Sequence, residues 1–188
     1  MKNLFDNIYG VKVNLIELSL DYLDDMFEYS SDERLYEYFE FIPQKNIEST
    51  REYLVNLIKK SNKIDAYWWF IQLQKTSKVV GSFGIHDIDL RRGVCEISYA
   101  VSPNYWGKGI FIEALNMVLK SLFNDFNFHR ITAVTSSQNI RSINALKKVG
   151  FKEEGVFRDN MLYADGNRDD LTSLALLVHE YRHNKLLK

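Results

Sequence analysis

Hydrophobic and polar positions alternate along this chain with two periods, one typical of helices and one typical of strands. After residue 110, apolar side chains recur at helical spacing, at Ile112, Leu115, Val118, Leu119, Leu122 and Phe123. Helices are also predicted over residues 20–29, 47–58 and 139–149, the last ending at a Gly150 cap. Runs rich in β-branched and aromatic residues predict strands over residues 11–18, 67–73, 79–88, 94–101, 130–135, 151–163 and 171–178. This alternating order predicts an α/β fold class.

The turn between strand 94–101 and the helix after it is rich in glycine, which lets a ligand come close to the backbone. It reads Trp106-Gly107-Lys108-Gly109-Ile110-Phe111. Glycine permits a tight turn near a ligand, and the first N–H groups of the following helix carry partial positive charge without intrahelical partners. The turn is therefore a candidate phosphate site. Two glycines before a helix also occur in turns that bind nothing, so the motif alone does not decide.

Further motifs downstream complete a pattern that extends over most of the chain. After the glycine turn come the β-rich run 128–134, then Asn139-Ile140-Arg141-Ser142, then Gly150-Phe151. In this order and spacing the sequence resembles the GCN5-related N-acetyltransferases (GNAT), most closely the ribosomal-protein alanine and serine acetyltransferases (RimJ/RimL-like). The resemblance covers roughly residues 11–178. It implies a single acetyltransferase domain over residues 1–188 with an α+β GNAT fold, a mixed central sheet of about seven strands flanked by about four helices.

The resemblance implies acetyl-CoA as co-substrate, no metal ion, and direct attack by a primary amine in a ternary complex. The family's coenzyme contacts correspond to Val101, Trp106, Gly107, Lys108, Gly109, Ile110, Phe111, Asn139 and Ser142. The coenzyme arm is expected in a gap between strands 94–101 and 130–135, paired with backbone. Phe111 departs from the family pattern, which has a small residue there. We therefore expect a rotated first helical turn or a different contact with the pyrophosphate.

Glu96 is the first candidate for moving a proton, because the similar family places a glutamate at this position beside the substrate. A carboxylate there can accept the proton of the amine directly or through water. The alternative is a strand carboxylate that only faces solvent. Some relatives instead carry a base in the penultimate strand, where this chain has Met161, so the identity of the base stays open.

Ser142 is the second catalytic candidate. Many relatives protonate the departing thiolate with a tyrosine, but Leu146 occupies that position here. In the N-terminal-acetylating branch, a serine three residues after the asparagine lies near the sulfur, and a hydroxyl can donate one hydrogen bond to it. Asn139 and Ser142 also fit a plain helix cap, and both roles can hold at once.

Acceptor contacts are predicted at Tyr36, Tyr38, Trp68, His86 and Tyr99. We place Tyr99 on the strand face of Glu96, although an aromatic residue on a central strand more often belongs to the core. Trp68 and Trp69 point to opposite faces, so at most one of them reaches a pocket. His86 has a structural or exposed position as its alternative.

Acidic residues dominate the segment 21–40, where Asp21, Asp24, Asp25, Glu28, Asp32, Glu33, Glu37 and Glu40 accompany the single Arg34. In the fold that the sequence resembles, this segment borders the acceptor groove. A basic peptide N-terminus or a polyamine is therefore the acceptor that this segment predicts. A solvated acidic helix face is an equally open interpretation.

Composition narrows the class of protein without naming the acceptor. A chain of 188 residues with 46% hydrophobic content can bury a full core without disulfides. A formal charge of −1 disfavours a nucleic-acid partner, and four scattered histidines disfavour a metal site. The single cysteine, the absence of a signal-peptide pattern in residues 1–6 and the short apolar runs favour the cytoplasm and no membrane partner.

Two other functions remain open at this point, and the chain is expected to be a monomer or a homodimer. One is acetylation of a small amine, a polyamine or a nucleotide amino sugar by the same machinery. The other is a non-catalytic acyl-CoA-binding module, which the replacement of the tyrosine by Leu146 and the bulky Phe111 both suggest.

Overall fold

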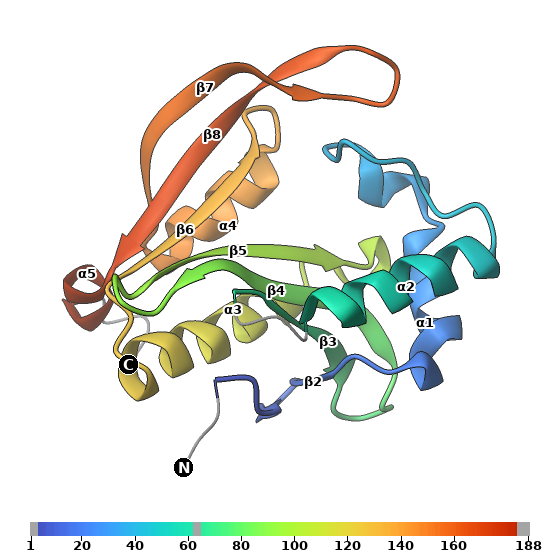
Figure 1. Cartoon of the computed structure of the whole chain (residues 1–188), viewed down its shortest axis with the longest axis horizontal. Helices are drawn as coiled ribbons and strands as arrows, with labels where there is room; N and C mark the ends of the chain where they lie inside the picture. Colours follow the sequence, from blue (N-terminus) through green and yellow to red (C-terminus); the bar gives the residue numbers. More distant parts are fainter. Residues whose placement is uncertain (1–3, 62–64, 184–188) are drawn as a thin grey trace.

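The described strands form one mixed sheet in the order β1-β2-β3-β4-β5-β6-β8-β7 (Figure 1). The structure is a computed structural model and describes residues 4–61 and 65–183. The strands are β1 Ile8–Tyr9, β2 Val13–Glu17, β3 Tyr67–Leu73, β4 Val79–Asp89, β5 Val94–Val101, β6 Arg130–Ser136, β7 Lys152–Leu162 and β8 Arg168–Leu177. Only β5 and β6 pair in parallel among these described strands. The mixed sheet is confirmed, and the two-residue β1 adds an eighth strand to the seven predicted.

Two predictions from the sequence include residues outside the described ranges. The predicted domain over residues 1–188 includes residues 1–3, 62–64 and 184–188, which lie outside the described residues. The same holds for residues 1–3 of the segment in which no signal-peptide pattern was found.

The four predicted helices are present, with changes at their ends. The helices are α1 Leu23–Ser30, α2 Ile47–Ser61, α3 Ile110–Lys120, α4 Ile140–Val149 and the unpredicted α5 Val178–His183. The predicted helix 20–29 begins instead as a 3₁₀ turn over Leu20–Tyr22, capped by Ser19. Gly150 ends α4 with a φ of 115°, a left-handed conformation that favours glycine and confirms the predicted cap.

Helices cover both faces of the sheet, and each face has its own apolar core. One core joins α3 and α4 to the sheet through side chains such as Leu115 and Leu146, with Trp69 among them. The other joins α1 and α2 to the sheet around Phe70, with Trp68 at its margin. Trp68 and Trp69 therefore lie on opposite faces, as the period of a strand requires.

The two parallel strands diverge soon after they meet. β5 and β6 pair only from Val94 opposite Arg130 to Glu96 opposite Thr132. β5 then continues to Val101, while β6 stays paired with β8 over its whole length (Figure 1). Beyond Glu96, the β5 backbone therefore has no strand partner on this side, which confirms the expected gap.

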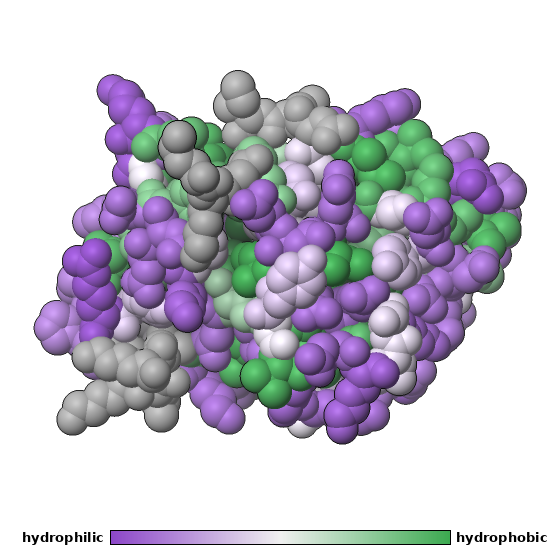
Figure 2. All heavy atoms as spheres, turned by 90° about the horizontal axis from the view of Figure 1, so that it is seen from below, coloured by the Kyte–Doolittle hydropathy of each residue, from purple (hydrophilic) through white to green (hydrophobic). Residues whose placement is uncertain are grey.

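The last two strands form a hairpin, the β7–β8 arm, in which β8 pairs with β6 and the turn end extends past it (Figure 1). β7 is the edge strand, and its side chains are exposed along nearly its whole length. On the face seen from below, hydrophobic residues reach the surface in separate patches among hydrophilic ones (Figure 2). Within residues 4–61 and 65–183, no helix is long and apolar enough to cross a membrane.

Candidate active site

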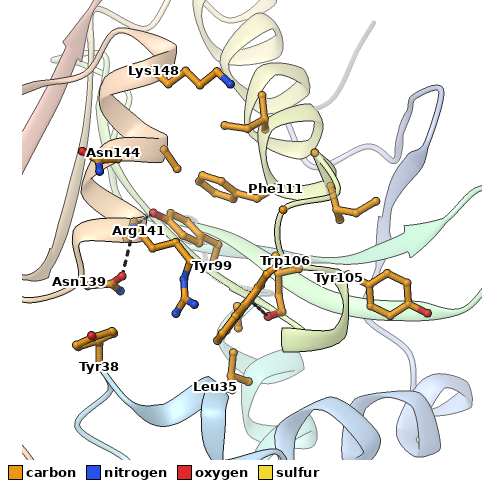
Figure 3. A pocket seen from close by; sticks show the side chains of 18 of the residues that line it. Leu35, Tyr38, Tyr99, Tyr105, Trp106, Phe111, Asn139, Arg141, Asn144 and Lys148 are labelled. Carbon is orange, nitrogen blue, oxygen red and sulfur yellow. Dashed lines mark hydrogen bonds between the residues drawn. The ribbon is translucent and has the colours of Figure 1, made fainter.

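A cavity of about 420 Å³ lies between the end of β5, the start of α3 and the start of α4 (Figure 3). Its lining consists of Leu35, Tyr38, Phe39, Tyr99, Ala100, Val101, Tyr105, Trp106, Gly107, Gly109, Ile110, Phe111, Ile112, Asn139, Arg141, Ser142, Asn144, Ala145 and Lys148. Every predicted coenzyme contact except Lys108 is part of this lining. Of the predicted acceptor contacts, Tyr38 and Tyr99 line the cavity, whereas Tyr36, Trp68 and His86 do not.

The glycine turn has the backbone conformation that its two glycines suggested. Gly107 and Gly109 have φ values of 73° and 79°, in the left-handed region. A Cβ on Gly107 would meet no atom within 4 Å, so this position faces open space. The Trp106 indole donates a hydrogen bond of 2.7 Å to the carbonyl of Val101 and closes the turn. Because α3 begins right after Gly109, its first N–H groups lie at the cavity without intrahelical acceptors.

Phe111 forms part of the cavity wall. Its ring lies against the ring of Tyr99, with 4.0 Å between the centroids (Figure 3). α3 follows directly on the glycine turn, and Phe111 is its second residue. The volume that a small residue would leave open is instead filled by these two aromatic rings.

Tyr99 and Ser142 join the two walls of the cavity by a side-chain hydrogen bond. The phenol oxygen of Tyr99 lies 2.6 Å from Oγ of Ser142. The backbone N–H of Ser142 donates to Oδ1 of Asn139 at 3.1 Å, so the predicted helix cap is confirmed. Burial raises the pKa of Tyr99 to about 12, which keeps the phenol protonated at neutral pH. The cavity thus holds two adjacent hydroxyl groups, one from β5 and one from α4.

The segment that leads into α4 is held by a polar cluster on β8. Asp169 accepts hydrogen bonds from the Ser136 hydroxyl, from the Tyr163 hydroxyl at 3.2 Å and from the side chain of Gln138 at 3.3 Å. Burial alone would raise the pKa of Asp169, but these hydrogen bonds, with one from the Asp170 N–H, hold it below its ordinary value. Sequence reasoning missed this cluster because Ser136 and Gln138 lie 33 and 31 residues from Asp169 and meet it through the pairing of β6 with β8.

Basic side chains near the cavity were also missed. The guanidinium of Arg141 lies over the Trp106 ring, 3.4 Å from its centroid (Figure 3). Lys148, about two helical turns further along α4, also lines the cavity. Lys12 donates from Nζ to the Lys108 carbonyl at 3.4 Å, beside the glycine turn. Arg141 stands inside the predicted Asn139 to Ser142 motif, and a closer look at that motif could have found it. Lys12 is 96 residues away from Lys108 in sequence, and no local signal marks it.

Glu96 lies outside the cavity lining, at the point where β5 and β6 stop pairing. It stands opposite His86 on β4 and is half-buried. Burial raises the pKa of the Glu96 carboxyl, while His86 acts in the opposite direction. The assignment of Tyr99 to the same face was wrong: a spacing of three residues puts the two side chains on opposite faces of a strand, and Tyr99 packs on the α3 side.

The acidic segment contributes apolar and aromatic rather than acidic side chains to the cavity, through Leu35, Tyr38 and Phe39. Asp25 accepts from the Val79 N–H at 2.8 Å, and Glu28 pairs with Lys78 at 2.6 Å. At the end of the segment, Glu40 accepts from the Leu162 N–H at 3.2 Å and so connects it to the β7–β8 arm. Several of its carboxylates are thus used in internal contacts.

Comparisons with known proteins show the family of this chain. The sequence matches the family described as Acetyltransferase (GNAT) domain over residues 12–152. The chain belongs to the GNAT acetyltransferase family. The uncharacterized N-acetyltransferase p20 of Bacillus licheniformis is 29% identical over 176 residues, which cover 94% of this chain and 98% of that protein. The ribosomal protein uS5-alanine N-acetyltransferase of Escherichia coli (strain K12) is 31% identical over 87 residues, 46% of this chain and 44% of that protein.

A solved structure shows the same fold. It is the microcin C7 self immunity acetyltransferase MccE in complex with acetyl-CoA and AMP, with a TM-score of 0.79 and 20% identity over 89% of this chain and 93% of that chain. The resemblance to GNAT enzymes is therefore confirmed. The protein is an N-acetyltransferase with acetyl-CoA as its co-substrate, and not a non-catalytic binding module.

The cavity of this GNAT acetyltransferase fits acetyl-CoA. The open space at Gly107 admits a phosphate close to the backbone, and the N-terminus of α3 with Lys12 nearby supplies positive charge. The unpaired edge of β5 offers backbone groups to the amides of the arm. When bound, acetyl-CoA supplies the thioester carbonyl that an amine attacks.

Proposed function

We propose that the acceptor is the α-amine at a peptide or protein N-terminus. The observation that carries this proposal is the chemistry of the cavity lining, which among the described residues contains no carboxylate and no imidazole. Two cations, Arg141 and Lys148, are present instead. Such a site has no base in the cavity wall itself, and Glu96 lies outside the lining and can act only through water, so the site favours an amine that is already partly neutral near pH 7.

The pKa of the amine then decides between acceptor classes. An α-amine has a pKa near 8, so roughly a tenth of it is neutral at pH 7. A lysine-type amine has a pKa near 10.4, and fewer than about one molecule in a thousand is neutral. A polyamine would in addition be repelled by Arg141 and Lys148. Both effects favour the α-amine.

The segment formed by residues 34–40, at one wall of the cavity, also favours a chain end as the acceptor. It is fixed on one side by Arg34, which donates to Asn104 at 2.9 Å, and on the other by Glu40, which accepts from the Leu162 N–H. Tyr38 and Phe39 between these contacts form the cavity wall. An amine that passes this segment is best presented at the end of a flexible chain.

The state of the single cysteine supports direct transfer of the acetyl group in a ternary complex. Cys95, the single cysteine of the sequence, is 3% exposed, and burial raises the pKa of its thiol to about 12, so it offers no thiolate nucleophile. In the proposed mechanism, Glu96 accepts the amine's proton through water, and the β5 backbone polarises the acetyl carbonyl. Ser142 donates a hydrogen bond to the departing sulfur.

A thiol-release assay with acetyl-CoA tests the acceptor. The panel contains a peptide with a free N-terminal Ser or Ala, the same peptide with a blocked N-terminus and one internal lysine, spermidine, and a nucleotide amino sugar. We expect release with the free N-terminus to exceed that with the internal lysine and with spermidine by about tenfold or more, which follows from the neutral fractions of these amines. Faster release with spermidine or the amino sugar contradicts the proposal, and mass spectrometry of the peptide locates the acetyl group.

A further inference from the structure

The hydroxyl of Tyr99 is placed to assist the leaving group of the reaction. Tyr99 reaches into the cavity from β5, and its oxygen lies 2.6 Å from Oγ of Ser142 on α4. Ser142 is 8% exposed, and within the described residues its hydroxyl has no other hydrogen-bond partner. The tyrosine that α4 would carry in many relatives is Leu146 here, a fully buried core residue. The cavity therefore contains a tyrosine hydroxyl, supplied by a different element.

We propose that Tyr99 is a positioning residue that acts through Ser142: its hydroxyl donates to the Ser142 oxygen, which turns the serine proton toward the departing sulfur. The inference rests on the proposed place of Ser142 beside that sulfur. A phenol is a stronger hydrogen-bond donor than an aliphatic hydroxyl, so this direction is the favourable one. Chains of hydrogen bonds strengthen one another in a cavity of low dielectric.

The tyrosine keeps its proton during the reaction. In the transfer, the C–N bond forms, the C–S bond breaks with its electron pair going to sulfur, and one proton passes from the acceptor nitrogen to sulfur. The pKa of Tyr99, raised by burial to about 12, lies well above the value near 8.5 of an ordinary thiol. A proton would not move from the phenol to the thiolate. Tyr99 and Ser142 thus stabilise the charge on sulfur by hydrogen bonds until the proton of the amine arrives.

The packing around Tyr99 fixes its direction. Phe111 of α3 lies against one side of the ring at 4.0 Å, and Phe83 of β4 stacks at 6.0 Å, both between centroids. With these rings in place, the hydroxyl is directed toward α4 (Figure 3). The large Phe111, which departs from the family pattern, therefore has a role in holding Tyr99.

The charged and titratable groups near the pair are few. Arg141 and Lys148 of α4 line the same cavity, as do Tyr38 and Tyr105. The neighbouring side chains from α3 and β4 are the uncharged Phe111 and Phe83. Arg141 and Lys148 also favour a thiolate. Variants that remove only a hydroxyl group leave both cations in place and so keep their effect on the thiol constant.

The test measures the pKa of the CoA thiol in the complex, without an acceptor. Calorimetry gives the affinity of CoA and of desulfo-CoA, which lacks the thiol, across a pH range that spans about two units either side of the ordinary thiol pKa of 8.5. We expect Ser142→Ala to raise the bound thiol pKa and Tyr99→Phe to raise it by roughly half to one unit, the net effect of one hydrogen bond. The double variant should match Ser142→Ala, because Tyr99 acts through the serine. Turnover of Tyr99→Phe should fall by about five- to tenfold at an unchanged KM for acetyl-CoA.

The outcomes separate this inference from the proposed function. Tyr53→Phe, which removes a hydroxyl on α2 outside the cavity lining, serves as the matched control and should leave the thiol pKa unchanged. An unchanged thiol pKa in Tyr99→Phe, or additive effects in the double variant, overturns the role of Tyr99. An unchanged thiol pKa in Ser142→Ala overturns the placement of Ser142 as well. The choice of acceptor has no influence on either result.

Discussion

The two walls of the cavity are built in different ways. The glycine wall, residues 101–111, relies on backbone conformation: two left-handed glycines, a Trp106 to Val101 hydrogen bond and the free N–H groups of α3. The α4 wall, residues 139–148, relies on side chains: the Asn139 cap, the Ser142 hydroxyl and the polar cluster around Asp169 behind them. Backbone N–H groups can bind an anion without a particular side chain, whereas side-chain hydroxyl groups can donate hydrogen bonds to reacting atoms. The first is therefore suited to holding the coenzyme and the second to assisting the chemistry.

The largest effect is expected from Gly109→Val in the glycine wall. A β-branched residue at a φ of 79° is strained, and the altered turn would no longer present its N–H groups. We expect the affinity for acetyl-CoA, measured by calorimetry, to fall by about a hundredfold or more. Gly166→Val is the matched control, since Gly166 has a φ of 89° in the turn of the β7–β8 arm, away from the cavity lining. Unchanged affinity in Gly109→Val, or an equal loss in the control, would contradict the role of this wall.

Replacing Glu96 tests whether a carboxylate outside both walls, where β5 and β6 stop pairing, is the base that accepts the amine's proton. Because burial raises the pKa of Glu96, its carboxylate form is lost at a higher pH than that of an ordinary glutamate. Turnover of the wild type should therefore fall on the acid side, starting above the ordinary glutamate pKa of about 4.3. Glu96→Gln should lower turnover by about tenfold or more and remove this acid limb. Near wild-type turnover with an intact acid limb would exclude Glu96 as the base.

Asn139→Ala weakens the α4 wall alone. Loss of the cap should cost about 1 kcal/mol of unfolding free energy and, by loosening Ser142, lower turnover by about fivefold. Asn46→Ala is its counterpart on α2, because Asn46 Oδ1 accepts from the Ser49 N–H at 2.9 Å in the same kind of cap. Denaturant unfolding and thiol release together decide the point. Equal turnover in both variants would show that the Asn139 cap only stabilises its helix.

The smallest effect is expected from the acidic segment, residues 21–40, which belongs to neither wall. With several of its carboxylates already bound to other groups, we expect a peptide with Lys or Arg near its free N-terminus to be preferred over an acidic one by only a few-fold. The preference should shrink as salt rises, since such exposed charges are screened. Competition between the two peptides at low and high salt measures it. No preference at either salt concentration would show that these carboxylates have no part in choosing the acceptor.

Local signals in the sequence were sufficient for most of the fold and for the glycine wall. The periodic apolar positions located the strands and the four main helices, and Gly107, Gly109, Asn139 and Gly150 have the conformations that their types suggested. Such features depend on one residue and its chain neighbours. The family resemblance rests on the same local motifs, and the match over residues 12–152 confirms it.

The tertiary structure alone decided the contacts between distant segments. The bond between Tyr99 and Ser142 joins residues 43 positions apart, Lys12 reaches the glycine turn from 96 positions away, and Asp169 holds the start of α4 from β8. Tyr99 was placed on the wrong strand face, and its partner on α4 was not foreseen. Side-chain spacing fixes which residues share an element's face, but the packing of separate elements determines which hydroxyls, charges and rings meet in the cavity.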